Sequence, residues 1–187
     1  MTVPKRNRAH AFDDFARKMG WPAKCDPELD FEAPLLCELL AVWREQSAHG
    51  DLPNRHHLGP RVLKSFLGWI CILERCESGP VRYRIRLMGS HLANALGDMQ
   101  GKYLEEVLTP EVVLHWQARL ELAETEHRPM RFISRVDIPG KQHLRSESFW
   151  APLAAQAGAP PQFLMAAVLS LFDGQEFEPF SSDWLVA

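Results

Sequence analysis

Two neighbouring segments with strand patterns, residues 69–75 and 81–87, constrain the fold of this chain more than any other feature. The first, Trp-Ile-Cys-Ile-Leu-Glu-Arg, is apolar on both faces, which indicates a strand in the middle of a sheet. The second alternates strictly, which indicates a strand with one buried face. A turn sequence at 77–80, Glu-Ser-Gly-Pro, joins them, so we predict an antiparallel hairpin. The apolar side of the second strand is Val81, Tyr83, Ile85 and Leu87, and its polar side is Arg82, Arg84 and Arg86.

Helix and strand patterns on both sides of the hairpin predict an α+β fold. A helix is expected from Pro34 to about Ala48, because proline suits the first helical turn and apolar residues follow at helical spacing. Three further helical segments lie between Ser90 and Arg128, and the one that begins after Thr109 has the strongest start signal. The last three predicted strands are residues 130–138, 143–153 and 163–172.

Length and composition favour one domain of ordinary globular type. The chain has 187 residues, and we place the domain at 33–178, with an N-terminal extension at 1–32 and a C-terminal tail at 179–187. The formal charge of −3 argues against general nucleic-acid binding, which depends on an excess of Lys and Arg. No apolar run approaches the roughly 20 residues of a membrane span, and no signal peptide is indicated. We therefore expect a cytoplasmic protein that binds neither nucleic acid nor membrane.

The cysteine and histidine spacings give no sign of a metal centre. The four cysteines contain no C-x-x-C pair, so neither a zinc site nor a redox pair is indicated, and free thiols suit a reducing cytoplasm. His56 and His57 are adjacent in a loop, without a third ligand at useful spacing. We expect no metal, no cofactor and a colourless protein. The cysteines are Cys25, Cys37, Cys71 and Cys76.

The order of these elements, with certain residues in them, resembles the PAS domain, and specifically a bacterial family of small single PAS-like domains. The most specific piece is an Arg-x-x-Gly-Ser step at 86–90 that leads into a helix, followed by Gly97 and Gly101. One departure stands at Gly59, where family members tend to carry an acidic residue before the loop's proline. The resemblance runs from about Leu36 to Phe172, and its other signatures are residues 38–44, 52–55, 83–90 and 101–104, Glu147, and Pro152-Leu153.

The resemblance implies a five-stranded antiparallel sheet in the order 2-1-5-4-3, with helices that enclose a small cavity on one face. It also implies a module that senses a ligand or redox state, or that forms dimers, without a shared catalytic centre. His115 lies on the long helix where some PAS sensors hold haem iron, but it stands at the edge of the apolar stripe, and no flavin-type Asn-Cys-Arg-Phe segment is present. We therefore carry over no cofactor.

A cavity of this kind would have apolar walls and a few polar groups. We expect His91, at the mouth between sheet and helices, and Ser148 to supply the polar groups, although a helix's first turn often carries a surface histidine. The parity of the strand around Trp150 stays open, because Phe149 and Trp150 are both large. The expected lining is Tyr83, Ile85, Leu87, His91, Leu92, Leu104, Leu108, Trp116, Phe132, Ser148 and Trp150.

The opposite, outer face of the sheet is expected to be covered by the helix that begins at Pro34. If Ile70 and Ile72 face the cavity helices, the alternate residues of that strand form an apolar patch that must be covered. The helix would pack there and help form a homodimer, with Glu38 and Glu45 near the strand arginines. The expected interface is Leu36, Leu39, Leu40, Trp43, Trp69, Arg82, Arg84 and Arg86.

Three classes of function compete at this stage. The first is a PAS-like sensory or interaction module without its own output domain, which binds a small ligand, a signalling partner or both. The second is a small cone-shaped α+β enzyme, an isomerase or dehydratase, which needs a buried acid–base pair in a deep pocket. Asp137 and Glu147, however, fall on the outward-facing set. The third is an RNA-binding module on the arginine strand, which lacks interleaved aromatic residues.

Overall fold

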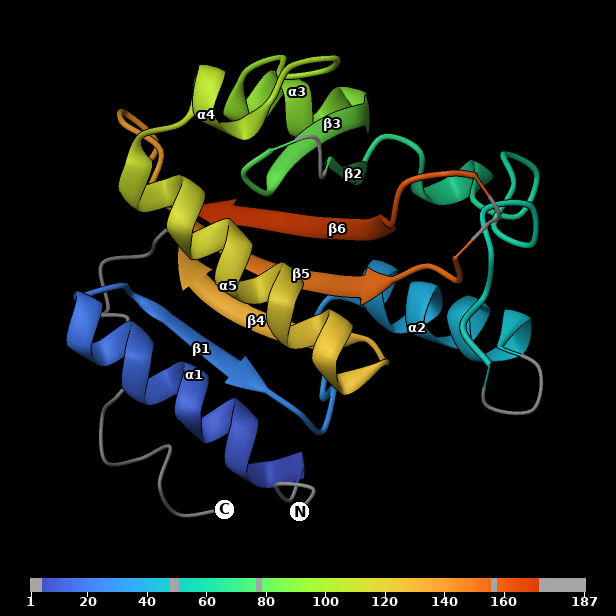
Figure 1. Cartoon of the computed structure of the whole chain (residues 1–187), viewed down its shortest axis with the longest axis horizontal. Helices are drawn as coiled ribbons and strands as arrows, with labels where there is room; N and C mark the ends of the chain where they lie inside the picture. Colours follow the sequence, from blue (N-terminus) through green and yellow to red (C-terminus); the bar gives the residue numbers. More distant parts are fainter. Residues whose placement is uncertain (1–4, 48–50, 77–78, 156–157, 172–187) are drawn as a thin grey trace.

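The predicted hairpin forms one edge of a six-stranded antiparallel sheet in the computed structural model, which describes residues 5–47, 51–76, 79–155 and 158–171. Figure 1 shows helices on both faces of this sheet. No helix in the described ranges is long and apolar enough to cross a membrane. The elements are α1 (Lys5–Met19), β1 (Ala23–Asp26), α2 (Pro34–Gln46), a 3₁₀ turn (Lys64–Phe66), β2 (Ile70–Cys76), β3 (Arg82–Met88), α3 (Ser90–Leu96), α4 (Leu104–Val107), α5 (Pro110–Glu126), β4 (Met130–Arg135), β5 (Leu144–Pro152) and β6 (Gln162–Leu171).

The strand order is β1-β4-β5-β6-β2-β3, and every pairing is antiparallel. The five strands β2 to β6 have the order that the resemblance implies, so that prediction is confirmed. A sixth strand, β1, was not predicted; it pairs with β4 through residues 23–26. Its pattern of four residues, closed by Pro27, is too short to stand out in the sequence. The expected tail at 179–187 lies outside the described residues, and the domain boundary at residue 32 stays a prediction.

The sheet separates two apolar clusters. On the inner face, α1, α3, α4 and α5 pack over side chains such as Phe132 and Trp150. On the outer face, α2 packs over Ile70, Phe149 and Leu164 (Figure 1). β5 is therefore covered on both sides, with Phe149 facing outward and Trp150 inward. This settles the parity that the sequence left open.

The direction of the side chains on β2 is the reverse of our prediction. Cys71 and Leu73 belong to the inner cluster, whereas Ile70 and Ile72 belong to the outer one. The sequence could not decide between the two, because this strand is apolar on both faces. The assignment of Ile70 and Ile72 to the cavity side is therefore wrong.

A β-bulge in the hairpin corrects a second prediction. The register shifts between Ile72, which pairs with Leu87, and Leu73, which pairs with Ile85. The extra residue, Arg86, turns the following side chains over, as bulges do. Leu87 therefore packs against the outer cluster, and Met88 takes the inner position in its place.

The predicted packing of α2 on the outer face is confirmed, but its apolar residues are used within the chain. Leu36 and Leu39 are fully buried, and the Trp43 ring packs edge-on against Phe149 at 5.7 Å. These side chains are therefore not exposed to a second copy. A homodimer stays a prediction, and it would need other surface residues. All four predicted α2 interface residues, Leu36, Leu39, Leu40 and Trp43, are buried.

The arginines of β3 and the tryptophan before β2 have partners other than α2. Arg82 pairs with Glu105, and Arg84 donates from Nε to the Gly101 carbonyl at 3.0 Å. Arg86 lies 3.2 Å from Glu74 across the hairpin. The expected partners Glu38 and Glu45 are exposed on α2. Trp69 stacks on the His91 ring instead of joining the outer cluster.

The Gly-Ser step into α3 has a steric explanation. A Cβ at Gly89 would lie 2.2 Å from the carbonyl oxygen of Leu67 and 2.4 Å from the carbonyl carbon of Gly68. Only glycine permits so close an approach between two backbones. The Gly89 amide also donates to the Ile70 carbonyl, and the His91 amide to that of Gly68. The motif therefore fixes the start of α3 against the strand β2.

A buried arginine on the outer face joins the N-terminal residues to the sheet. Arg131 of β4, 4% exposed, donates from Nε to Glu147 at 2.6 Å and from Nη1 to Asp26 at 2.9 Å. Its Nη2 lies 3.4 Å from Glu32. Glu147 in turn accepts the backbone N–H groups of Glu32 and Ala33, at 2.9 and 2.8 Å. One cluster therefore holds β1, the segment before α2, β4 and β5 together.

We expect Arg131→Met to lower the free energy of unfolding by about 3 kcal/mol, because it leaves Glu147 buried without a cation. The double variant Arg131→Met/Glu147→Gln should recover part of this loss, since it removes the uncompensated charge as well. Urea unfolding followed by tryptophan fluorescence measures both. Arg61→Met, at an exposed position, is the matched control and should change stability little. Equal stability of Arg131→Met and wild type would contradict the role given to the cluster.

Candidate functional site

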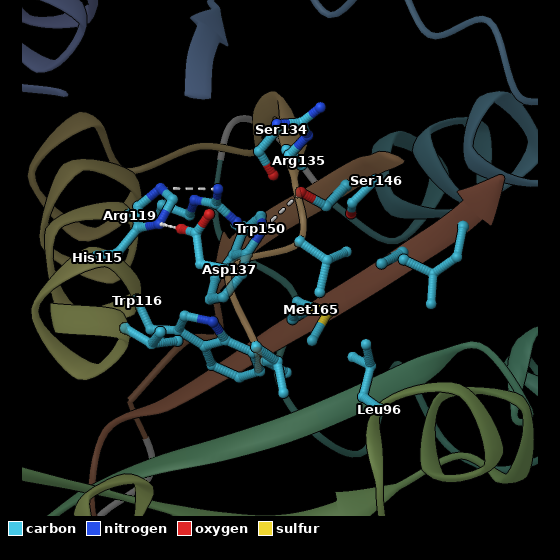
Figure 2. A pocket seen from close by; sticks show the side chains of 16 residues that line it. Leu96, His115, Trp116, Arg119, Ser134, Arg135, Asp137, Ser146, Trp150 and Met165 are labelled. Atoms are coloured by element: carbon cyan, nitrogen blue, oxygen red, sulfur yellow. Dashed lines mark hydrogen bonds and ion pairs between the residues drawn. The ribbon is translucent and has the colours of Figure 1, made fainter. Parts of the chain in front are cut away.

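A small cavity lies between α5, the inner face of the sheet and the segment that follows β4 (Figure 2). Its volume is about 40 Å³, which is room for roughly three water molecules. Its walls combine apolar side chains with polar and charged ones. The lining residues are Leu96, Val112, His115, Trp116, Arg119, Ser134, Arg135, Val136, Asp137, Ile138, Ser146, Ser148, Trp150, Met165, Ala167 and Leu169.

Three of the eleven residues that we expected to line a cavity do so: Trp116, Ser148 and Trp150. Trp116 and Trp150 meet edge to face, with ring centroids 5.3 Å apart. The Trp150 indole N–H donates to Ser148 Oγ at 2.9 Å. The Ser148 hydroxyl therefore already accepts a hydrogen bond from Trp150, and a ligand in the cavity would have to share this hydroxyl with the indole.

The other expected residues lie elsewhere. Leu87 is on the outer face, and His91 is exposed and stacked on Trp69, with ring centroids 4.4 Å apart. His91 is thus outside the cavity, and the surface reading of this residue fits the structure. The remaining six residues do not line the cavity. Leu108 packs against the inner-face core, and five belong to that core: Tyr83, Ile85, Leu92, Leu104 and Phe132.

The polar wall is built around His115, which the sequence analysis placed at the edge of the α5 stripe. Its Nδ1 lies 2.5 Å from Asp137 Oδ2, and its Nε2 lies 2.9 Å from Arg119 Nη2. The ring stacks on Trp21 at 4.6 Å, so a residue from the N-terminal segment supports the site. Figure 2 shows the three polar side chains gathered at one end of the cavity, beside Trp150.

The two partners fix the protonation state of the imidazole. Arg119 can only donate, so Nε2 must accept, and Nδ1 therefore carries the proton that is donated to the Asp137 carboxylate. Burial, together with the charge of Arg119, lowers the pKa of His115 to about 4. His115 is thus neutral at physiological pH, with one defined tautomer.

Arg119 is the least compensated charge of the site. It is 5% exposed, and burial lowers its pKa to about 10, so it stays cationic at neutral pH. Among the described residues its only hydrogen bond is the one to His115, and no carboxylate oxygen lies within 4 Å of its guanidinium. The rings of Phe132 and Trp150 lie 5.3 and 5.5 Å from its Cζ. Aromatic faces attract a cation, but they do not neutralise it.

The orientation of Asp137 differs from our prediction and has a clear cause. We assigned Asp137 to the outward-facing set by continuing the β4 alternation to residue 138. The strand ends at Arg135, so the alternation ends there too, and Asp137 is free to turn toward α5. Glu147, which lies inside β5, keeps its predicted outward direction.

The contribution of α5 could have been found in the sequence. His115 and Arg119 are four residues apart, and each falls next to an apolar member of the buried stripe, Trp116 and Leu120. Residues at this spacing lie on one helix face. A histidine and an arginine that share the core-facing stripe are a signal for a buried polar site. The apolar positions of the same stripe give the stronger signal, and they obscure the polar one.

The geometry of the site also shows whether its residues could hold a metal ion or haem. Among the described residues no three His, Cys, Asp or Glu side chains are grouped as metal ligands. His115 Nε2, the atom that would bind haem iron, accepts from Arg119, and a cavity of about 40 Å³ is far too small for a macrocycle. The residues present therefore do not fit haem at this position.

We expect the free energy of unfolding to fall by about 2 kcal/mol between pH 7 and pH 5 because of His115. Its pKa is about 4 in the folded protein and near 6.5 in the unfolded chain, so the unfolded chain takes up the proton first. Urea unfolding at the two pH values should show this loss in wild type and in His143→Gln, a control at an exposed position. His115→Gln should show less of it. An unchanged pH dependence in His115→Gln would contradict the assignment.

The solved structures that this chain is similar to share little sequence with it. No curated protein matches the sequence. Among solved structures, the chain is similar to one described as an RNA-binding light-oxygen-voltage receptor, with 13% identity, a TM-score of 0.40, and 61% of this chain and 33% of that chain covered. The chain thus spans about a third of that receptor. It is also similar to a variant of RsLOV, with 13% identity, a TM-score of 0.38, and 82% and 78% of the two chains covered.

The sequence itself carries a family pattern over most of its length. The model of the PAS domain family matches residues 32–168, from just before α2 almost to the end of β6. This range includes the Gly-Ser step, α5 and all the polar residues that line the cavity, but not Trp21, which stacks on His115. The protein therefore belongs to the PAS domain family.

Proposed function

We propose that this PAS domain is a sensory or interaction module that binds a small molecule in the cavity beside α5 and responds through a protein partner. The observation that carries the proposal is the buried guanidinium of Arg119 on the cavity wall, without a carboxylate contact among the described residues. A buried charge of this kind is costly unless something compensates it. A bound ligand would compensate it. The four cysteines, all free, suit the reducing cytoplasm in which we place the protein.

The site also has a route to the protein surface. Asp137 and Ile138 line the cavity, and the next two residues, Pro139 and Gly140, are exposed in the turn before β5. A ligand that contacts this wall would change the positions that the segment can adopt. A partner that docks on the turn would then detect whether the cavity is occupied.

The enzyme alternative has one observation in its favour, a buried acid–base pair. The pair His115–Asp137 meets the chemical condition that we set for such an enzyme. However, Arg119 occupies Nε2 and Asp137 binds the proton on Nδ1, so neither ring nitrogen faces a substrate. The sensory proposal therefore accounts better for the site.

The RNA-binding alternative has less support. Arg82 and Arg86 pair with the carboxylates of Glu105 and Glu74, and Arg84 donates to a backbone carbonyl. Arginines that are already paired have less charge to offer to phosphates.

Native mass spectrometry of the protein purified from its own host tests the proposal. We expect a small adduct on the intact protein, a bound partner, or both. Ala167→Leu, which fills the cavity from β6, should lose the adduct, whereas Ala155→Leu at an exposed position should keep it. A wild-type protein that carries neither adduct nor partner would contradict the proposal.

A further inference from the structure

The charges on the cavity wall indicate which class of ligand could bind there. The cationic guanidinium of Arg119 and the carboxylate of Asp137 both line the cavity, and His115, which contacts both, is neutral at physiological pH. Asp137 is engaged by the imidazole N–H, which stands between its carboxylate and the Arg119 guanidinium. An anion is the ligand that this arrangement favours.

The shape and size of the site narrow the class of anion that could bind there. A guanidinium presents its N–H groups in one plane and matches the two oxygens of a carboxylate. The space of about 40 Å³ accepts roughly three or four non-hydrogen atoms, by the volume that a water molecule needs. The wall opposite the charged residues is apolar, with Leu96 and Met165 (Figure 2). A carboxylate on a carbon chain of one or two atoms satisfies all three conditions.

We infer that the cavity binds a small carboxylate of the size of formate or acetate, with its oxygens at Arg119 and its carbon against the apolar wall. Ser134 and Ser146, neighbours on β4 and β5, lie on the sheet side of the same cavity and offer hydroxyl groups to the second oxygen. This inference rests on the proposed function, because it names the chemical class of the ligand for the same site.

Ligand-observed saturation-transfer NMR with sodium acetate at pH 7 in low-chloride buffer tests the inference. We expect a signal from acetate and none from acetamide, which has the same shape without the charge. Propionate should bind at least tenfold more weakly than acetate, because its extra carbon exceeds the cavity. Arg119→Met should weaken acetate binding at least tenfold, and Arg61→Met, at an exposed position, should leave it unchanged.

The outcomes separate this inference from the proposed function. Equal binding of acetate and acetamide, or full binding by Arg119→Met, would overturn the carboxylate assignment. Absence of acetate and formate binding would also overturn it, and the proposed function would stand if an adduct of another class were present in native mass spectra. Absence of any adduct and of any partner would overturn both. If Arg119→Met does not fold, Ala167→Leu replaces it: it must abolish acetate binding, while Ala155→Leu must retain it.

Discussion

The ion pair between Arg131 and Glu147 adds side-chain contacts to the backbone pairing that joins β1, β4 and β5, and it fixes the segment before α2 against them. Two charged groups removed from water gain stability only if their remaining hydrogen-bonding capacity is used as well. Here it is used: the guanidinium also reaches Asp26 and Glu32, and the carboxylate accepts two backbone N–H groups. The contact of Arg131 with Asp26 reinforces the backbone pairing of β1 with β4. This places Trp21, two residues before β1, behind the imidazole of His115. The inner site thus depends on a cluster on the opposite face.

Arg119 and Arg131, the two arginines that are buried among the described residues, differ in how their charge is compensated. Arg131 contacts three carboxylates, whereas Arg119 contacts a neutral imidazole and two aromatic rings. The first arrangement is what a fold needs for stability. The second leaves the attraction of the guanidinium for an anion unused, beside a space that can receive one. This contrast within one chain is the physical reason to propose the cavity as a binding site and to treat the charged cluster around Arg131 as a structural one.

Much of the fold was predictable because its signals are local. The alternation of β3, the capping residues before α5 and the Gly-Ser step each depend on a few neighbouring residues, and the order of five strands followed from them with the resemblance. The side-chain directions of β2 were not predictable, since a strand that is apolar on both faces has no preferred parity. The bulge at Ile72 and Leu73 and the end of β4 at Arg135 depend on tertiary pairing. These two irregularities displaced Leu87 from the expected cavity wall and turned Asp137 into it.

The end of β4 is also where the proposed response to a ligand would arise. Inside a central strand, ladder hydrogen bonds hold the backbone on both sides, so a change of ligand could move that backbone and the side chains on it little. Asp137 stands beyond the strand, so its position depends on the hydrogen bond to His115 and on the backbone bond of Val136 to Leu144. An anion at Arg119 would compete with the imidazole for the guanidinium. His115 would then lose a donor at Nε2, and its bond to Asp137 would be the one to readjust. In the proposed function, this local exchange of hydrogen bonds would link the cavity to the exposed turn before β5.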